Sequence, residues 1–255
     1  MKLAFFLLCL VAFSSRSASC AGAPATNSFE QANKLYEQKQ YSKALSVYDG
    51  LIQQGGISSA LLFNAGNAAF KSKQIGRAIA HYRAALQLAP RDPDIQANLR
   101  FARNTVENGS QITRFTDRFS RILTFNELTV VTAVFLWLWF GLLAIRELRP
   151  ALRPALRGYT LLSGIMLGAF GLWLGAIAIV AAKDHPGVIV ANEAAARFGP
   201  LEESQVAFTL RDGSEVQILA ARPGWVEIRD ARGRRGWVAQ GSLKPLSSIT
   251  NIKAG

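Results

Sequence analysis

Two long apolar stretches without a charged residue limit what this chain can fold into more than any other feature of the sequence. They cover residues 128–145 and 158–182. A helix needs about 20 apolar residues to cross the hydrocarbon core of a bilayer, so the first stretch is near the minimum and the second is ample. Neither holds an ionisable group, which argues against a proton or ion pathway. The sequence predicts two transmembrane helices, at 127–145 and 158–182.

The connection between these stretches indicates their orientation. Residues 146–157 contain four arginines and one glutamate. Short loops rich in Lys and Arg remain in the cytoplasm, so we expect a hairpin with a cytoplasmic loop at 146–157 and both ends outside. The second helix also carries small residues at three- and four-residue spacing, which favours close helix–helix contact. These residues are Gly164, Gly168, Gly171 and Gly175.

The N-terminus has the pattern of a secretory signal peptide, predicted at 1–21. Lys2 precedes an apolar run over 3–13 that is too short to span a bilayer, and small polar residues follow it. Cleavage near residues 19–21 would deliver the following segment outside, in agreement with the hairpin orientation. Cys20 offers an alternative, because it could be a lipidated residue at the start of the mature chain.

Composition excludes several classes of function. The net charge is +12, but the densest basic segment flanks the apolar stretches, which indicates lipid head groups rather than nucleic acid. Both cysteines lie in the first twenty residues, and His81 and His185 fall in different predicted domains. No Cys- or His-based metal site is therefore expected. Glycine-rich phosphate loops and nucleophile elbows are missing from the sequence, so we expect no cofactor and no catalysis.

An internal repeat with an offset of 34 residues lies between the signal peptide and the apolar stretches. Each unit has two helix-length segments with apolar residues at helical spacing. A small residue in the first helix lets the second approach, and a tyrosine fills the space between units. When 25–58 is laid over 59–92, similar residues coincide at Ala32/Gly66, Asn33/Asn67, Tyr36/Phe70, Ala44/Ala78 and Tyr48/Tyr82.

This period and these residue types resemble the tetratricopeptide repeat. We therefore expect a helical repeat domain at 25–107, with repeats at 25–58 and 59–92 and a capping helix at 93–107. Residues 111–126 place four apolar side chains on one helical face, which predicts an amphipathic juxtamembrane helix in the head-group layer. A helix that packs back on the repeats is the alternative for this segment.

The C-terminal part changes to strand periodicity. Five short runs punctuated by Asp-Gly, Pro-Gly and Arg-Gly pairs predict a small β barrel at 184–246, with Val216, Ile218, Val226 and Ile228 on its inner face. The paired Gly-Trp-Val units at 224–226 and 236–238 resemble the bacterial SH3-like domain. The expected fold is thus a multidomain membrane protein, with all-α repeats, a two-helix transmembrane hairpin and an all-β SH3-like barrel.

The order of signal peptide, tetratricopeptide repeats, two spans and SH3-like tail resembles BatE-type proteins of the Bacteroides aerotolerance group. The resemblance implies a non-catalytic bacterial envelope scaffold at the outer face of the cytoplasmic membrane. Its implied partners are the lipid bilayer and membrane proteins with von Willebrand A domains. The alternative is a cell-wall protein whose SH3-like domain binds peptidoglycan.

Two surfaces are candidates for binding. The first helices of the repeats should line a concave face that binds a partner peptide, with the asparagines holding its backbone and Lys71 meeting a carboxylate. Its candidate residues are Asn33, Tyr36, Phe63, Asn67, Phe70 and Lys71. The alternative is that both asparagines only bond the helices of their own stack, across the repeat. In the tail, Trp225 and Trp237 could form an aromatic groove, or could simply pair across strands.

Overall fold

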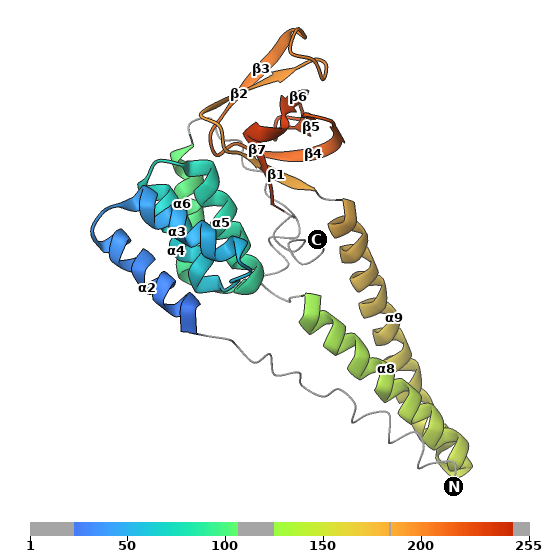
Figure 1. The fold of residues 1–255 in the computed structure, drawn as a ribbon. Helices are drawn as coiled ribbons and strands as arrows, with labels where there is room; N and C mark the ends of the chain where they lie inside the picture. Colours follow the sequence, from blue (N-terminus) through green and yellow to red (C-terminus); the bar gives the residue numbers. More distant parts are fainter. Residues whose placement is uncertain (1–22, 107–124, 184, 247–255) are drawn as a thin grey trace.

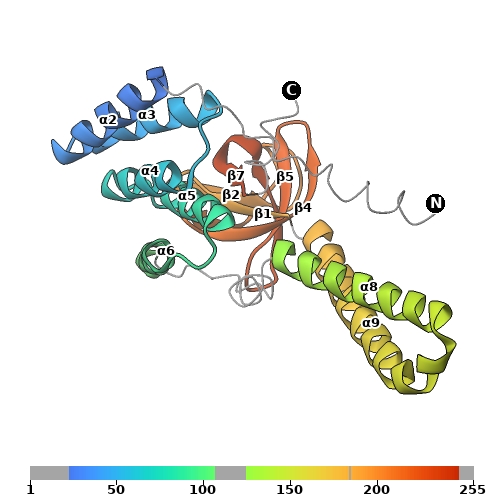
Figure 2. The ribbon, with the colours of Figure 1, turned by 90° about the horizontal axis from the view of Figure 1, so that it is seen from below.

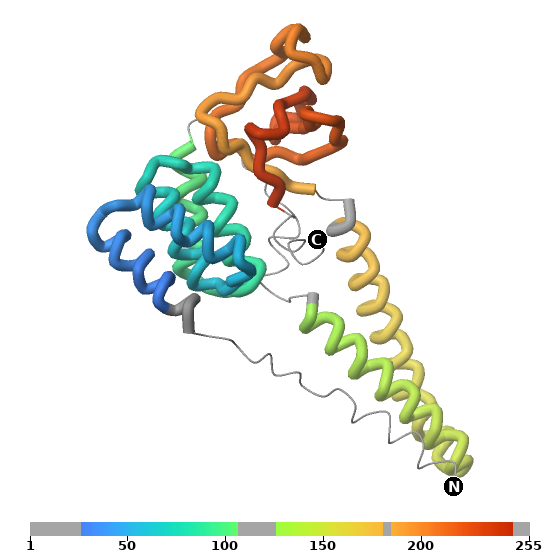
Figure 3. The backbone as a smooth tube through the Cα atoms, viewed as in Figure 1, coloured from blue at the N-terminus to red at the C-terminus, as the bar shows by residue number. Residues whose placement is uncertain are grey.

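The computed structural model describes residues 23–106, 125–183 and 185–246 (Figure 3). The predicted signal peptide lies outside these residues, as does the amphipathic segment 111–126 apart from its last two positions. In the described part, a stack of repeat helices and a β domain lie against each other, and two long helices project from them as a hairpin (Figure 1).

Five helices form the repeat stack, and consecutive helices pack side by side from α2 to α6 (Figure 2). Their bounds are α2 Ala23–Glu37, α3 Tyr41–Gln53, α4 Ser59–Lys71, α5 Ile75–Leu88 and α6 Pro93–Thr105. Ser58 and Asp92 cap α4 and α6 by accepting backbone N–H bonds. The α2–α3 and α4–α5 turns both contain a lysine with positive φ, Lys39 at 61° and Lys73 at 63°. The 34-residue period of the sequence is therefore reproduced in the backbone.

The core of the stack depends on small residues facing tyrosines. Tyr48 and Tyr82 are almost fully buried, as are Ala44 and Ala78. A Cβ added to Gly66 would lie 2.6 Å from two ring carbons of Tyr82. The glycine is required because the buried ring has no room to move aside.

We expect Gly66→Ala to lower the free energy of unfolding by about 1–3 kcal/mol through overpacking against Tyr82. Gly50→Ala is the matched control, since Gly50 also lies inside a helix but its added Cβ would meet nothing within 4 Å. That control should stabilise by about 1 kcal/mol through helix propensity. Denaturant unfolding in detergent, followed by circular dichroism, measures both. Equal effects at the two glycines would contradict the packing argument.

Two helices are long and apolar enough to cross a membrane, α8 Phe125–Leu148 and α9 Arg153–Lys183. Only 6% of each apolar window is buried, unlike the core helix of a soluble protein. They suggest membrane association. The 3₁₀ turn η2, Pro150–Leu152, joins them, so the connection is shorter than the predicted loop 146–157. The helix continues through Pro154 because proline is tolerated in the first turn.

Fewer glycines of α9 lie in close contact with α8 than the sequence predicted. A Cβ on Gly164 would lie 3.0 Å from Nε1 of Trp139, so this glycine does allow close approach of α8. Added Cβ atoms on Gly168, Gly171 and Gly175 would meet nothing within 4 Å. Aromatic stacking fills part of the contact instead, with the rings of Phe135 and Phe170 5.3 Å apart.

Seven antiparallel strands form one sheet in the order β3-β2-β6-β5-β4-β1-β7. Their bounds are β1 Pro186–Ile189, β2 Glu193–Arg197, β3 Val206–Arg211, β4 Glu215–Arg222, β5 Trp225–Arg229, β6 Arg235–Ala239 and β7 Leu243–Pro245. The predicted inner face is confirmed, because Val216, Val226 and Ile228 are buried and Ile218 packs against them. The sequence missed β2, which is rich in alanine, and β7, which is short and ends in proline, since both residue types are depleted in strands.

Candidate functional site

The recurrence of an asparagine one period apart in the two repeats corresponds to a hydrogen-bond ladder. Tyr48 donates its hydroxyl to Asn33 Oδ1 at 2.6 Å, and one period later Tyr82 donates to Asn67 Oδ1 at 2.7 Å. The next first-helix also contributes. Asn64 Nδ2 donates to Asn33 Oδ1 at 3.2 Å, and Asn98 Nδ2 donates to Asn67 Oδ1 at 3.0 Å.

This ladder binds the first helices of successive units to each other. Burial raises the pKa of the Tyr48 hydroxyl to about 12 and raises that of Tyr82 further, so both remain donors. The amide oxygens of Asn33 and Asn67 are thus engaged inside the stack. This geometry favours the structural alternative for the two asparagine oxygens, and a role in holding a peptide stays a prediction.

The three aromatic candidates of the concave face, Tyr36, Phe63 and Phe70, are all half-buried and all pack against the core of the stack. Phe63 packs against the core, with its ring centroid 6.0 Å from that of Tyr82. Tyr36 contacts Tyr41 edge-on at 5.2 Å, and Phe70 contacts Phe101 at 5.4 Å. Phe101 is 63% exposed, although it is a large apolar side chain. All three rings are therefore partly accessible and also contribute to the packing of the stack, whereas Lys71 is exposed.

Trp225 and Trp237 lie on the outer face of the sheet. The residue after each of them, Val226 and Val238, is buried on the inner face, and successive side chains of a strand alternate between faces. In the β5–β6 ladder Trp225 pairs with Ala239 and Trp237 pairs with Glu227, so the two rings occupy neighbouring positions. Both tryptophans are half-buried, and the guanidinium of Arg222 lies 5.2 Å from the Trp237 ring. The pair is thus strand-paired and partly accessible, and an aromatic groove remains a prediction.

A buried ion cluster that sequence reasoning missed joins the repeats to the β domain. Glu215, at the start of β4, has a side chain only 2% exposed. Arg83 of α5 donates to both of its oxygens, from Nε at 3.0 Å and Nη2 at 2.9 Å. Arg103 of α6 donates to the same carboxylate from the other side, from Nε at 3.0 Å. One carboxylate of the β domain therefore binds two repeat helices.

The electrostatics of this cluster favour the ionised carboxylate. Burial by itself raises the pKa of Glu215, but Arg83 and Arg103 outweigh it and hold the pKa below its usual range. Two bidentate guanidinium contacts also fix orientation, because the planar forks match the carboxylate.

A second contact between the domains caps a helix. The residue before α5, Gln74, makes no side-chain cap bond. Asp212 of the β3–β4 turn replaces it, since its Oδ1 accepts from the Gly76 N–H at 2.9 Å. Burial raises the pKa of Asp212, and hydrogen bonds from Gly76 and its neighbours oppose this rise. The β domain thus supplies the N-terminal cap that the repeat helix lacks.

A third group lies under β7. His81 of α5 is fully buried, with Nε2 3.2 Å from Asp49 Oδ1 of α3, although the contact lacks hydrogen-bond alignment. Asp49 is also paired with Arg77, and the ammonium of Lys244 faces the same group. Burial lowers the pKa of His81, against the opposing effect of Asp49. For Asp49, burial acts to raise the pKa, but His81 and the two cations together hold it below normal.

We expect acid to destabilise the folded protein in two steps. His81 has a folded pKa below its ordinary value of about 6.5, so the unfolded chain binds more protons and stability falls as pH drops from about 7 to 5. Asp49 and Glu215 have lowered pKa values, so their contribution is lost below about pH 5, partly offset by Asp212, whose raised pKa acts with the opposite sign.

Denaturant unfolding in detergent across this pH range measures the effect. His81→Gln should flatten the dependence between about pH 7 and 5. An unaltered slope in the His81 variant would show that another group is responsible.

Comparison with known families adds two matches to this geometry. Residues 190–245 match the bacterial SH3 domain. Residues 59–92, which form α4 and α5, match the tetratricopeptide repeat. A comparison with curated proteins finds no match to the chain. The predicted fold class, with helical repeats, two long apolar helices and an SH3-like β domain, is confirmed.

Tetratricopeptide repeats and SH3 domains are typically binding modules without catalytic activity. In the described ranges, no three His, Cys, Asp or Glu side chains gather in a way that could hold a metal ion. The residues that sequence reasoning missed are Glu215, Arg83, Arg103 and Asp212. Arg83 and Glu215 had a weak signal, a charged residue beside apolar ones in a helix and at the start of a strand. Asp212 was seen only as part of a turn, and Arg103 had no signal in its polar helix.

Proposed function

We propose that this chain is a non-catalytic envelope scaffold of bacteria, in which the tetratricopeptide repeats and the SH3 domain bind protein partners beside the cytoplasmic membrane. The observation that carries the proposal is the interface of Glu215 with Arg83 and Arg103. It joins two binding modules into one unit at the end of a membrane hairpin. Tethering near the membrane raises the effective concentration of membrane-bound partners, so each contact can be weak.

The resemblance to BatE-type proteins supports a finer version of this proposal. The partners would be membrane proteins with von Willebrand A domains, in a Bat-type complex. The partner-binding face would be the first-helix side of the repeats, with the exposed Lys71 and the half-buried rings of Tyr36, Phe63 and Phe70 as its candidates. Asn33 and Asn67 would support this face from within the stack.

Photo-crosslinking in native membranes tests the proposed face. With p-benzoylphenylalanine in place of Tyr36, we expect a crosslinked membrane protein that mass spectrometry identifies. The matched control places the same group at Gln87, an exposed position on α5, the second helix of its repeat. Equal crosslinking at the two positions would count against the first-helix side as the partner-binding face. So would the absence of crosslinking at position 36 in a variant that is folded.

The orientation is part of the proposal. Four arginines in residues 146–157, at the end of α8 and the start of α9, favour a bend in the cytoplasm, with the repeats and the SH3 domain on the periplasmic side. Protease added to spheroplasts should then digest both domains. Protection of both domains until the membrane is broken would reverse the orientation.

Binding of peptidoglycan is the alternative function, favoured by the exposed parts of Trp225 and Trp237 on the bacterial SH3 domain. The purified full chain in detergent should sediment with cell-wall material if this alternative holds. Loss of sedimentation in a Trp237→Ala variant would assign the binding to that face.

A further inference from the structure

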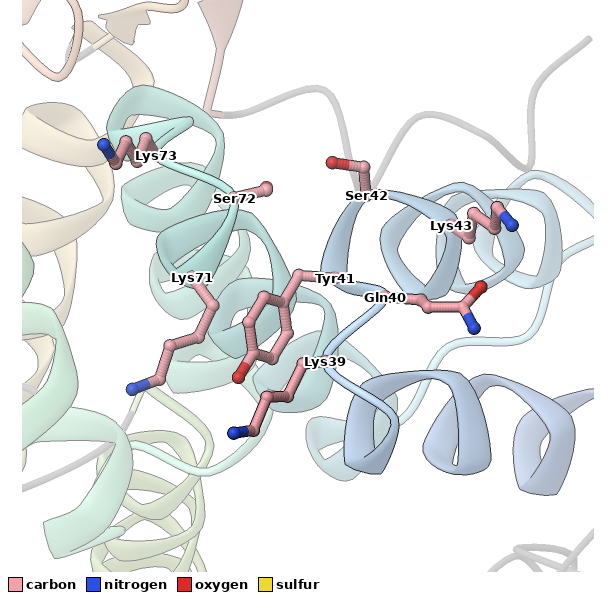
Figure 4. A pocket seen from close by; sticks show the side chains of 8 residues that line it. All are labelled: Lys39, Gln40, Tyr41, Ser42, Lys43, Lys71, Ser72 and Lys73. Carbon is pink, nitrogen blue, oxygen red and sulfur yellow. The ribbon is translucent and has the colours of Figure 1, made fainter.

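An open hollow lies between the α2–α3 turn and the α4–α5 turn (Figure 4). Its volume is about 590 Å³. Four lysines line it, Lys39 and Lys43 from the first repeat and Lys71 and Lys73 from the second, with Tyr41 between them. Because both turns belong to equivalent positions of successive repeats, the stacking itself brings these lysines together.

The charge of this lysine hollow is uncompensated. No Asp or Glu lines it. Among the residues that the structure describes, none of the four lysines has an ion-pair partner. The amines of Lys43 and Lys73 point away from the Tyr41 hydroxyl, whereas those of Lys39 and Lys71 lie on its side (Figure 4). Like charges repel and attract an anion, so a carboxylate bound between Lys39 and Lys71 would relieve their repulsion.

The side chains of the hollow are arranged for a shared ligand. Figure 4 shows the amines of Lys39 and Lys71 on the same side as the Tyr41 hydroxyl, so three donors face one region. The ring of Tyr41 also makes an edge contact with the ring of Tyr36. A carboxylate can accept from ammonium and hydroxyl donors together, in charge-assisted hydrogen bonds.

An exposed aromatic side chain near Lys71 points to the kind of anion. Lys71 follows Phe70, whose ring contacts Phe101, and Phe101 is 63% exposed. Cations beside an exposed aromatic suit a peptide that carries both acidic and apolar side chains, whereas a phosphate polymer would leave the aromatic unused.

From these observations we propose that the lysine hollow binds an acidic segment of a partner protein, with Lys39, Lys71 and Tyr41 on a carboxylate and Phe70 and Phe101 on an adjacent apolar side chain. The inference rests on the proposed function, because it assigns the chemistry of the partner that the repeats would bind. The hollow lies at the turns, so it is distinct from the asparagine ladder between the first helices.

Fluorescence anisotropy with the full chain in detergent tests the proposal. The probe is a labelled, capped peptide of glutamates followed by one phenylalanine. We expect saturable binding that weakens as salt is raised, and a loss of about tenfold or more in affinity for Lys39→Glu combined with Lys71→Glu. The control variant Lys34→Glu alters an exposed lysine of α2 outside the hollow and should change affinity less than about twofold.

Other outcomes would contradict the proposal that the lysine hollow binds an acidic peptide. Equal weakening by Lys34→Glu would mean non-specific charge attraction, and stronger binding to polyphosphate or to phosphatidylglycerol vesicles would mean a different anion. Suppose that a partner crosslinks at position 36 equally well with and without the double lysine substitution, and that the peptide does not bind. The peptide-binding role of the hollow would then be refuted, whereas the proposed scaffold function would stand. Peptide binding at the hollow without a crosslinked partner would instead weigh against the proposed function.

Discussion

Glu215→Ala is expected to lower the free energy of unfolding by about 3–5 kcal/mol, because it leaves two guanidinium groups in the interface without their carboxylate. Arg83 is 9% exposed and Arg103 is 16% exposed, so neither gains full solvation in place of the lost ion pair. The same change should loosen the joint between the domains. Denaturant unfolding and protease sensitivity of the purified protein in detergent measure the two effects.

Two variants sharpen this test. Glu202→Ala removes an exposed glutamate from the same domain and should change stability by less than about 0.5 kcal/mol. The combined change Glu215→Leu, Arg83→Met and Arg103→Met removes all the charges together and should recover much of the loss, since an apolar replacement of a buried ion cluster is often neutral. If the triple variant is no more stable than Glu215→Ala, stranded charge is not the cause of the loss.

Gly76→Ala should push α5 and the SH3 domain apart at the same interface through a steric clash. An added Cβ would lie 2.0 Å from the backbone oxygen of Ile189 and 2.5 Å from Oδ1 of Asp212. The backbone of β1 cannot yield as a flexible side chain would, so α5 must move away and lose its cap. Overpacking and cap loss together should cost about 2–4 kcal/mol. Hydrogen exchange should rise at the start of α5 and in the β3–β4 turn.

Gly241→Ala is the control for this substitution, because an added Cβ there would meet nothing within 4 Å. It should leave both stability and exchange nearly unchanged. If Gly76→Ala behaved like the control, the close approach of α5 to the SH3 domain would be refuted. The Glu215 and Gly76 variants act through different forces, so agreement between them would establish the interface independently.

The sequence predicted the parts of this protein that depend on local pattern. The offset of 34 residues located Tyr48 and Tyr82 in the core, and strand alternation located Val226 and Ile228 on the inner face. The strand β2 was missed, because its Ala-rich segment owes its state to pairing with β3 and β6 rather than to its own propensity. The glycine spacing of α9 predicted close contact with α8 at four positions, but of these four only Gly164 meets α8 closely.

For the candidate site too, the sequence identified the residues and the structure showed what they contact. Asn33 and Asn67 were identified from their recurrence, but recurrence does not tell a ligand contact from a bond within the stack. The hydrogen bonds from Tyr48 and Tyr82 to their oxygens came only from the structure. Lys71 was likewise a candidate by itself, and the structure placed it with Lys39 and Tyr41 around one hollow.

The sequence by itself determined the three modules and their order, because apolar length, helical spacing and strand alternation are properties of neighbouring residues. Only the tertiary structure decided how the modules meet. Glu215 is separated by 132 positions from Arg83 and by 112 from Arg103, and Asp212 is 136 positions from the helix start that it caps. Such pairs depend on the docking of one domain against another, and no local pattern records which buried charge will face which.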